Sequence, residues 1–245
     1  MHRFYHSNSL KIRQIAILDE FASHHATRVM RIKLHDELIL FNGDGFEYLA
    51  QVEEINKKIV KVKILRTEKN KKESPLKINL FQSISSNEKM DLVIQKATEL
   101  GAYNIQPVFS ERSSIKLNQD RVKKKLLHWN QVAISACEQS GRSKLPSILV
   151  PKLISQIMQE KKLFENSLNL LLHPHVEKRN PKLPNIHSGD INIFVGPEGG
   201  FTEDEIVLLQ TNKFINIQLG PRILRTETAP LAIIAILQYK YGDFA

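Results

Sequence analysis

A carboxylate lies inside a glycine-rich loop that follows an apolar stretch of the chain. Residues 193–195 (IFV) run into the loop GPEGG at residues 196–200, and FTEDEI then has the pattern of a helix start. A strand, a glycine loop and a helix in this order often receive a ligand at the loop. A phosphate loop needs Gly-Lys-Ser/Thr, and a dinucleotide fingerprint needs Gly-x-Gly-x-x-Gly. This loop has neither, and Glu198 would repel phosphate. It therefore favours a nucleoside-type ligand over a polyphosphate.

Two further apolar stretches end in a similar way. NLLLHP at residues 169–174 and IQLGPRILRTETAP at residues 217–230 both leave a predicted strand through a proline-containing exit. In parallel sheets, ligands bind beyond the carboxyl ends of the strands. The three exits therefore predict three walls of one crevice. The alternative is that Gly-Pro and His-Pro only terminate strands, which would account for any one of these loops alone.

The last exit also carries charged and hydroxyl side chains. Arg222, Arg225 and Glu227 lie close together before an apolar helix, with Thr226 and Thr228 among them. Either threonine is a suitable N-cap for that helix. Capping accounts for the threonines, but it does not account for two arginines and a glutamate beside a glycine-proline exit.

The elements that must position these loops fall into two regions. Residues 1–73 read as β-rich, and the polar, proline-ended stretch 66–75 reads as a linker, which places a domain boundary near Ser74. From residue 76 onward strands and helices alternate, a pattern typical of a mostly parallel sheet with helices on both faces. The fold class is therefore α/β, with domains at residues 1–73 and 74–245.

Several helices and caps can be predicted individually. Ser23 is a possible cap for a short helix from His24 to Arg31, and Thr202 with Glu205 forms a predicted capping box. Further helices are expected at about 87–100, 118–138, 153–164, 203–211 and 228–241, the last of them apolar nearly all round.

Charge and composition restrict the function classes. The chain has 245 residues and a formal net charge of +9. Residues 1–150 carry 25 Lys and Arg against 16 Asp and Glu, whereas residues 151–245 carry 10 of each. Such asymmetry favours a polyanionic partner, although a basic surface that only aids solubility is the alternative.

No apolar run is long enough for a membrane span, and the single cysteine, Cys137, is in keeping with a cytoplasmic location.

Six motifs together resemble the RsmE family, the 16S ribosomal RNA (uridine-N3) methyltransferases of the SPOUT superfamily. They are NEKMDLVIQKATELG, FSERS, ACEQSGR, LLHP, GPEGGF and LGPRILRTETA, in this order. The resemblance implies an N-terminal PUA-like β-barrel domain and a C-terminal SPOUT domain with a parallel sheet and a deep trefoil knot. It also implies S-adenosyl-L-methionine as cofactor, a homodimer, and one uridine in the decoding region of 16S rRNA, on the small ribosomal subunit, as target.

The resemblance assigns the cofactor to the three loops described above. The implied cofactor-binding residues are Leu172, His173, Pro174, Gly196, Pro197, Glu198, Gly199, Gly200, Leu219, Gly220, Leu224, Arg225, Thr226, Glu227, Thr228 and Ala229.

Methylation of uridine N3 requires loss of a proton, so the enzyme must stabilise the uridine anion, supply a base, or both. Arg112, Arg142 and Arg225 are candidates for lowering the pKa of the uridine electrostatically. Glu138 and Glu227 are candidate bases, and Glu227 is an equal candidate for holding the arginines or the cofactor in place.

Basic residues of the first 150 positions are candidates for contacts with RNA phosphates. The expected RNA-binding residues are Arg3, Arg28, Arg31, Lys33, Arg121, Lys123, Lys124 and Lys125. For the run 123–125 a solvated helix face is an equally good interpretation.

Two smaller signals and two rival functions remain. His173 and His175 have no third ligand at a suitable spacing, so no metal is expected. Trp129 is expected in the core or at an interface.

One rival function is a non-catalytic RNA-binding or ribosome-assembly protein, and the other is a SPOUT methyltransferase that acts on a different RNA. Three intact cofactor loops argue against the first rival, and the motifs ACEQSGR and LRTETA argue against the second.

Overall fold

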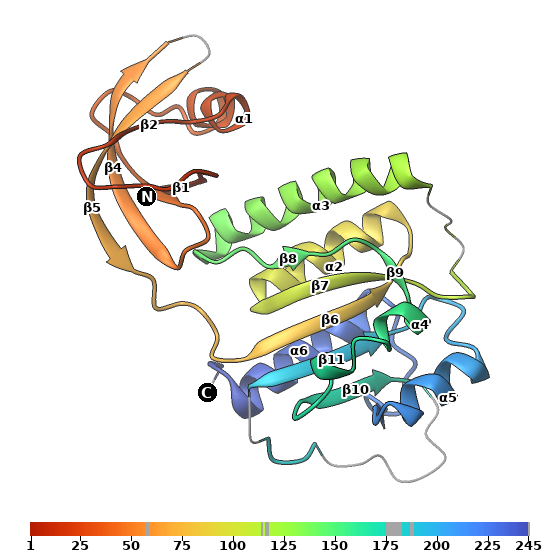
Figure 1. Cartoon of the computed structure of the whole chain (residues 1–245). Coiled ribbons are helices and arrows are strands. Elements are labelled where there is room, and N and C mark those ends of the chain that lie inside the picture. The colour runs from red at the N-terminus through yellow and green to blue at the C-terminus, as the bar shows by residue number, and fades with distance from the viewer. Residues whose placement is uncertain (57–58, 114, 116–117, 175–182, 187–188, 245) are drawn as a thin grey trace. The chain divides into compact units, whose positions relative to one another are not determined.

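The computed structural model divides the chain into two compact units. The first comprises Met1–Glu73 together with Ile134–Leu145, and the second comprises Ser74–Ala133 and Pro146–Ala245. The structure describes residues 1–56, 59–113, 115, 118–174, 183–186 and 189–244 (Figure 1). Each unit is built around its own buried core.

The first unit contains a five-stranded sheet in the order β1-β3-β4-β5-β2. Its strands are β1 (His2–Tyr5), β2 (Ile15–Ile17), β3 (Glu37–Phe41), β4 (Phe46–Ile55) and β5 (Val60–Lys69). Strand β1 runs parallel to β3, and the other pairs are antiparallel. Alternate residues such as Leu38, Leu40 and Val62 are buried, as the period of a half-buried strand requires.

The short helix of the first unit begins earlier than predicted. Helix α1 spans Glu20–His24 and continues into a π-helical turn, η1 (His25–Val29). Its cap is Asp19, whose carboxylate accepts a hydrogen bond from the backbone of Ala22 at 2.7 Å. The expected cap, Ser23, is buried inside the helix and donates to the carbonyl of Leu18 instead. The sequence prediction was wrong here because Asp and Ser compete for the same capping role.

The second unit contains an all-parallel sheet in the order β12-β10-β11-β6-β7-β8, with β9 also paired to β7. The strands are β6 (Lys77–Ser83), β7 (Ala102–Phe109), β8 (Ser147–Ile148), β9 (Lys152–Leu153), β10 (Leu168–Leu172), β11 (Asp190–Val195) and β12 (Ile215–Ile217). The helices are α2 (Asn87–Glu99), α3 (Gln119–Ser140), α4 (Ile154–Ile157), η2 (Lys161–Leu163, 3₁₀), α5 (Glu203–Thr211) and α6 (Thr228–Tyr241). The last turns of α3, from Ile134 onward, belong to the first unit.

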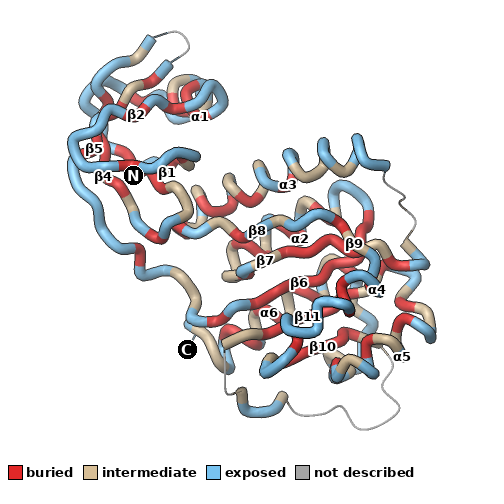
Figure 2. Tube along the Cα trace, in the orientation of Figure 1, coloured by how far each residue is buried: buried red, intermediate tan, exposed pale blue. Residues whose placement is uncertain are grey.

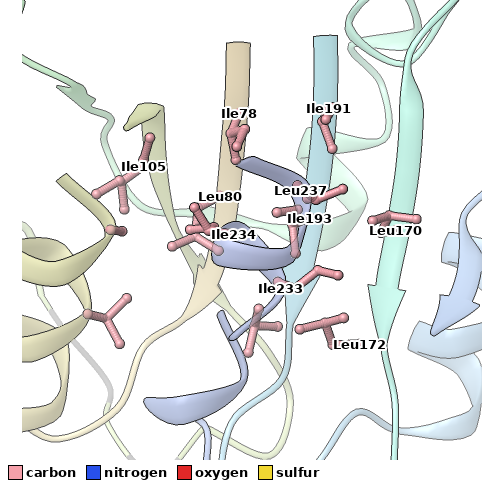
Figure 3. Packing of buried hydrophobic residues seen from close by; sticks show 14 of the residues in the cluster. Ile78, Leu80, Ile105, Leu170, Leu172, Ile191, Ile193, Ile233, Ile234 and Leu237 are labelled. Carbon is pink, nitrogen blue, oxygen red and sulfur yellow. The ribbon is translucent and has the colours of Figure 1, made fainter. Parts of the chain in front are cut away.

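Strands β6, β7, β10 and β11 are largely buried, as Figure 2 shows, and their apolar side chains belong to one core cluster on each face of the sheet. On one face, Ile233 and Leu237 of α6 pack with Ile193 of β11 (Figure 3). On the other face, Phe81 and Phe194 stack with ring centroids 4.4 Å apart and share a cluster with residues of α4 and α5. The predicted parallel sheet with helices on both faces is confirmed. The trefoil knot stays a prediction.

A row of asparagines crosses the sheet on the second of these faces. Asn104 donates to Asn79 at 2.8 Å, Asn79 donates to Asn192 at 2.9 Å, and Asn192 donates to Asn169 at 2.8 Å. These residues pair in register along four neighbouring strands. The amides satisfy one another inside the protein, where an unpaired amide would be costly.

The predicted helix at residues 153–164 differs from the structure. The stretch 153–164 is not one helix, because the chain tightens into short turns after Ile157 and brings Phe164 against Phe81 and Phe214. Tertiary packing of the aromatic ring outweighs helix propensity there. Helix α6 has the predicted bounds, and within this chain Tyr239 is 70% exposed. Among the described helices, none is both long and apolar enough to cross a membrane.

Candidate active site

A cavity of about 600 Å³ lies beyond the carboxyl ends of β12, β10 and β11 in the second unit. These three strands are neighbours and run parallel, so their exits meet at one edge of the sheet, as the sequence predicts. Of the predicted cofactor residues, all line the cavity except Gly220, Glu227 and Thr228. The lining residues that the sequence did not single out as cofactor-binding are Lys89, Arg112, Val195, Phe201, Ile217, Gln218, Arg222 and Ile223.

The loop after β11 needs its glycines for space and for backbone conformation. A Cβ atom at Gly196 would lie 3.2 Å from the ring of Phe201, and one at Gly199 would lie 3.3 Å from Cβ of Arg112. Gly200 has a φ of +70°, which L side chains rarely adopt. Arg112 then holds the loop, because its guanidinium donates to the carbonyls of Gly199 at 3.1 Å and Phe201 at 3.3 Å.

The predicted capping box at the start of α5 is present and also anchors the Arg112 segment. Thr202 Oγ1 accepts from the backbone of Glu205 at 3.3 Å, and the Glu205 carboxylate accepts from the backbone of Thr202 at 2.9 Å. The second carboxylate oxygen accepts from the backbone of Glu111 at 2.9 Å. Glu205 is buried, so this one side chain ties the loop after β7 to the loop after β11.

Thr226 connects two of the cavity loops through its hydroxyl group. Thr226 Oγ1 donates to the carbonyl of Gly196 at 2.6 Å and accepts from Nε2 of Gln82 at 3.0 Å. The expected role of Thr226 or Thr228 as N-cap is therefore wrong. The cap position of α6 is Glu227, with no side-chain capping bond, and the Thr226 hydroxyl is used inside the site.

Four charged side chains lie together at the cavity. Nζ of Lys89, from α2, is 2.8 Å from Glu198 and 3.8 Å from Glu227, and Arg225 is 4.0 Å from Glu227. The hydrogen bond with Glu198 raises the pKa of Lys89. Burial favours the neutral form of Glu198, but the hydrogen bond and charge of Lys89, with a backbone N–H, outweigh it and lower the pKa of that carboxyl. The exposure of the ion-pair partners differs widely: 82% for Arg225 and 12% for Glu227.

Two candidate catalytic residues, Glu138 and Arg142, belong to the first unit and are not among the described lining residues of the cavity. Burial raises the pKa of Glu138, whose carboxylate accepts from the backbone of Tyr5 at 3.0 Å. Arg142 is buried and donates to Glu73 at 3.0 Å. Both side chains therefore make contacts within the first unit, and their catalytic roles stay predictions.

The expected RNA-binding residues differ in their surroundings. Arg3 is paired with Glu47 at 2.5 Å and bonded to the carbonyl of Arg142, so it is committed to the interior of the first unit. Lys125 bonds to Asn87 and lies over the ring of Trp129. The remaining expected residues are exposed: Arg28, Arg31, Lys33, Arg121, Lys123 and Lys124.

The structure also shows the surroundings of His173, Cys137 and Trp129. The backbone N–H of His173 donates to the carbonyl of Ile217 at 3.2 Å, while His175 lies outside the described residues. Within the described part of the chain, no group of three metal-ligating side chains lies together. Cys137 is buried, and burial raises the pKa of its thiol to about 12. Trp129 belongs to the core of the second unit, in agreement with the prediction.

Both units match families of known proteins. The family model of the RNA methyltransferase domain matches residues 72–238, and that of the RNA methyltransferase PUA domain matches residues 18–65. The chain is 37% identical to the ribosomal RNA small subunit methyltransferase E of Buchnera aphidicola, over 99% of this chain and 98% of that protein. It is 32% identical to the protein of the same name from Bacillus subtilis, over 89% and 87%.

Solved structures agree with these matches. The crystal structure of a ribosomal RNA small subunit methyltransferase E from Neisseria gonorrhoeae, bound to S-adenosyl methionine, has a TM-score of 0.91 and 39% identity, with all of both chains covered. A protein from Legionella pneumophila, solved with the bound cofactor SAM, has a TM-score of 0.91 and 38% identity over 99% of this chain and 98% of that one. The chain belongs to the ribosomal RNA small subunit methyltransferase E family of RNA methyltransferases.

Proposed function

We propose that this chain transfers a methyl group from S-adenosylmethionine to N3 of one uridine in the decoding region of 16S rRNA. The observation that carries the proposal is the cavity formed by three neighbouring strand ends. Two similar proteins were solved with S-adenosylmethionine, and the relatives are named as small-subunit rRNA methyltransferases.

The residues around the cavity fit S-adenosylmethionine. About 600 Å³ is within the range of small-ligand sites, and the cofactor carries no phosphate that Glu198 would repel. Leu172, Leu219 and Leu224 offer apolar contacts for an adenine ring, while the glycine loop offers backbone polar groups. We therefore assign to this ligand those predicted cofactor residues of the three loops that line the cavity. When bound, it supplies a methyl group on a positively charged sulfur.

The chain's own residues must remove a proton from the uridine. Oε2 of Glu227 is buried and, among the described residues, has no hydrogen-bond partner. In our proposal this oxygen accepts the N3 proton, the N3 lone pair bonds to the methyl carbon, and the carbon–sulfur bond breaks with its electrons left on sulfur. Arg112 and Arg225 provide positive charge that stabilises the uridine anion.

The RNA is met by exposed cations in both units. In the first unit, Arg28, Arg31 and Lys33 lie in a stretch, residues 21–35, that contains no Asp or Glu. In the second unit, Arg121, Lys123 and Lys124 are exposed on α3. We propose that these side chains contact phosphates of the small subunit's rRNA. A substrate of this kind places the protein in the cytoplasm.

We further propose that the protein works as a homodimer. The apolar helix α6 leaves Ile236 and Tyr239 exposed, while Ile233 and Leu237 of the same helix lie in the core. Size-exclusion chromatography with light scattering should give twice the mass of the chain, and a monomer at assay concentrations would contradict this part.

The function is tested by incubating the protein with labelled S-adenosylmethionine and either assembled small subunits or naked 16S rRNA. We expect label at N3 of one uridine in the decoding region, located by mass spectrometry of nuclease fragments. Binding of the cofactor without methylation of either substrate would favour a non-catalytic ribosome-assembly protein. Methylation confined to another RNA or another atom would contradict the assigned specificity.

A further inference from the structure

The charged side chains that line the cavity are mostly cationic. Among the described lining residues, Glu198 is the only acid, against the cations Lys89, Arg112, Arg222 and Arg225. S-adenosylmethionine has a positively charged sulfonium group, whereas the sulfur of its product, S-adenosylhomocysteine, is neutral. The four cations suit the carboxylate that both molecules carry, but they repel the sulfonium and so favour the product over the methyl donor. Glu198 is therefore the one described lining side chain whose charge can reverse this preference.

Glu198 carries its charge where a ligand can reach it, because its side chain is 43% exposed. Burial favours the neutral form of the carboxyl group, but the hydrogen bond and charge of Lys89, with a backbone N–H, lower its pKa. The group is therefore an anion at neutral pH. Lys89 donates to Oε1 at 2.8 Å, and a carboxylate has about four acceptor sites. One bond from Lys89 thus leaves Glu198 able to attract a second cation.

The pair of Lys89 and Glu198 is not needed to hold the glycine loop. Arg112 and Thr226 already donate to backbone carbonyls of this loop through their side chains. An ion pair between partly exposed side chains adds little further stability. Holding the loop therefore does not account for a carboxylate in the wall of the cavity.

Lys89 opposes the charge of Glu198. Its ammonium group lies 2.8 Å from that carboxylate and lines the same cavity. Lys89 is the third residue of α2, where the helix dipole disfavours a cation, so helix stability does not account for it. Glu227, the other acid near Lys89 at 3.8 Å, is not among the described lining residues. Removing Lys89 should therefore strengthen the attraction of the cavity for a cation, whereas removing the charge of Glu198 should weaken it.

We propose that Glu198 sets the preference of the cavity for the positively charged methyl donor over the neutral product, and that Lys89 limits this preference by sharing the carboxylate. The inference rests on the proposed function in one respect, namely that the cavity is the cofactor site. It implies easier exchange of product for fresh donor, because the attraction of Glu198 for the ligand ends when the sulfur loses its charge.

The test measures the affinities of both ligands by calorimetric titration, without RNA, in wild type, E198Q, K89M and E203Q. E198Q should bind S-adenosylmethionine about three- to tenfold more weakly, and S-adenosylhomocysteine within about twofold of wild type, because only the former loses a charge interaction. K89M should raise the preference for S-adenosylmethionine. E203Q removes an exposed acid of α5 that is not among the described lining residues, so it should match wild type. Sinefungin, which has an ammonium-bearing carbon in place of the methylsulfonium group, should follow S-adenosylmethionine in each variant.

The outcomes separate this inference from the proposed function. Failure of wild type to bind either ligand refutes the cavity as the cofactor site, and with it the proposed function. An unchanged ratio of the two affinities in E198Q, with both equally reduced or both intact, refutes the role of Glu198 alone. A ratio that moves in the same direction in K89M and E198Q refutes the role of Lys89. The ratio within one variant does not depend on the fraction of binding-competent protein, so a partly unfolded variant still decides the question.

Discussion

Replacing Thr226 with valine tests whether its hydroxyl group holds the cavity together. Valine has nearly the same shape, so T226V removes the bonds to Gly196 and Gln82 and changes little else. Gln82 remains in a buried site, because it is 0% exposed and its Nε2 keeps only a bond to the Ser83 carbonyl at 3.2 Å, whereas Gly196 is half-buried and lines the cavity. T226S is the matched control, because it keeps the hydroxyl group and loses one methyl group.

The size of the effect follows from the two lost hydrogen bonds. A buried polar group left without its partner costs about 1–3 kcal/mol. Gln82 keeps one bond, and the Gly196 carbonyl lies at the cavity, where water can replace the hydroxyl group, so we expect T226V to lower the free energy of unfolding of the second unit by roughly 1–3 kcal/mol. T226S should lose about 1 kcal/mol or less. The affinity for S-adenosylmethionine should fall as well, because the loop after β11 loses its link to the loop before α6.

The protein contains a probe for this unit alone. Trp129 is the only tryptophan and lies fully buried in the core of the second unit. Urea unfolding followed by tryptophan fluorescence therefore reports the unit that carries Thr226. The midpoint gives the change in stability if the slope is unchanged, and calorimetric titration gives the cofactor affinity. Equal midpoints and equal affinities in T226V and T226S would refute the reasoning.

Two further predictions follow from the first unit. E138Q should unfold at a higher temperature than wild type at pH 7–8, because burial raises the pKa of Glu138 and ionisation then costs stability, while the amide oxygen still accepts from Tyr5. Because only the ionised carboxyl group costs stability, the higher stability of E138Q should vanish as the pH falls below about 4. An E138Q variant that is less stable than wild type at neutral pH would contradict this prediction. Replacing Arg28, Arg31 and Lys33 with alanine should lower the salt slope of RNA binding by about 2, at roughly 0.7 per phosphate contact. Fluorescence anisotropy at salt concentrations from about 50 to about 200 mM measures the slope. An unchanged slope would exclude these contacts.

The location of the site was predictable because its walls are local in sequence. Each wall is an apolar run that ends in a Gly-Pro or His-Pro exit, such as residues 169–174. Parallel strands place all such exits at one edge of the sheet. The capping box of Thr202 and Glu205 was also predictable, since both partners lie within one turn.

The chemistry inside the site was less predictable because it depends on long-range contacts. Lys89 reaches Glu198 across more than a hundred residues, and the only local sign was a cation in the first turn of a helix. Thr226 has the residue type of a helix cap, but its hydroxyl group bonds to Gly196. Arg3, a predicted RNA contact, is paired with Glu47 and has a side chain that is only 9% exposed. Charge and residue type alone do not distinguish these cases.

The asparagine row has a consequence for how the length of this protein can vary. A shift of one residue in any strand would move its amide to the aliphatic face of the sheet and break the row. The row therefore fixes the register of β10 and β11, which pair Asn169 with Asn192 and end together at Leu172 and Val195. Insertions in the helices or in the loops behind the sheet leave that alignment intact. An insertion of one residue between Asn192 and Gly196 would move the glycine loop outward by about 3.3 Å. It would also turn the last residue of β11 to the opposite face of the sheet. We expect related chains to vary in length in the helices and in the loops behind the sheet, and to keep the number of strand residues between the amides and the cavity.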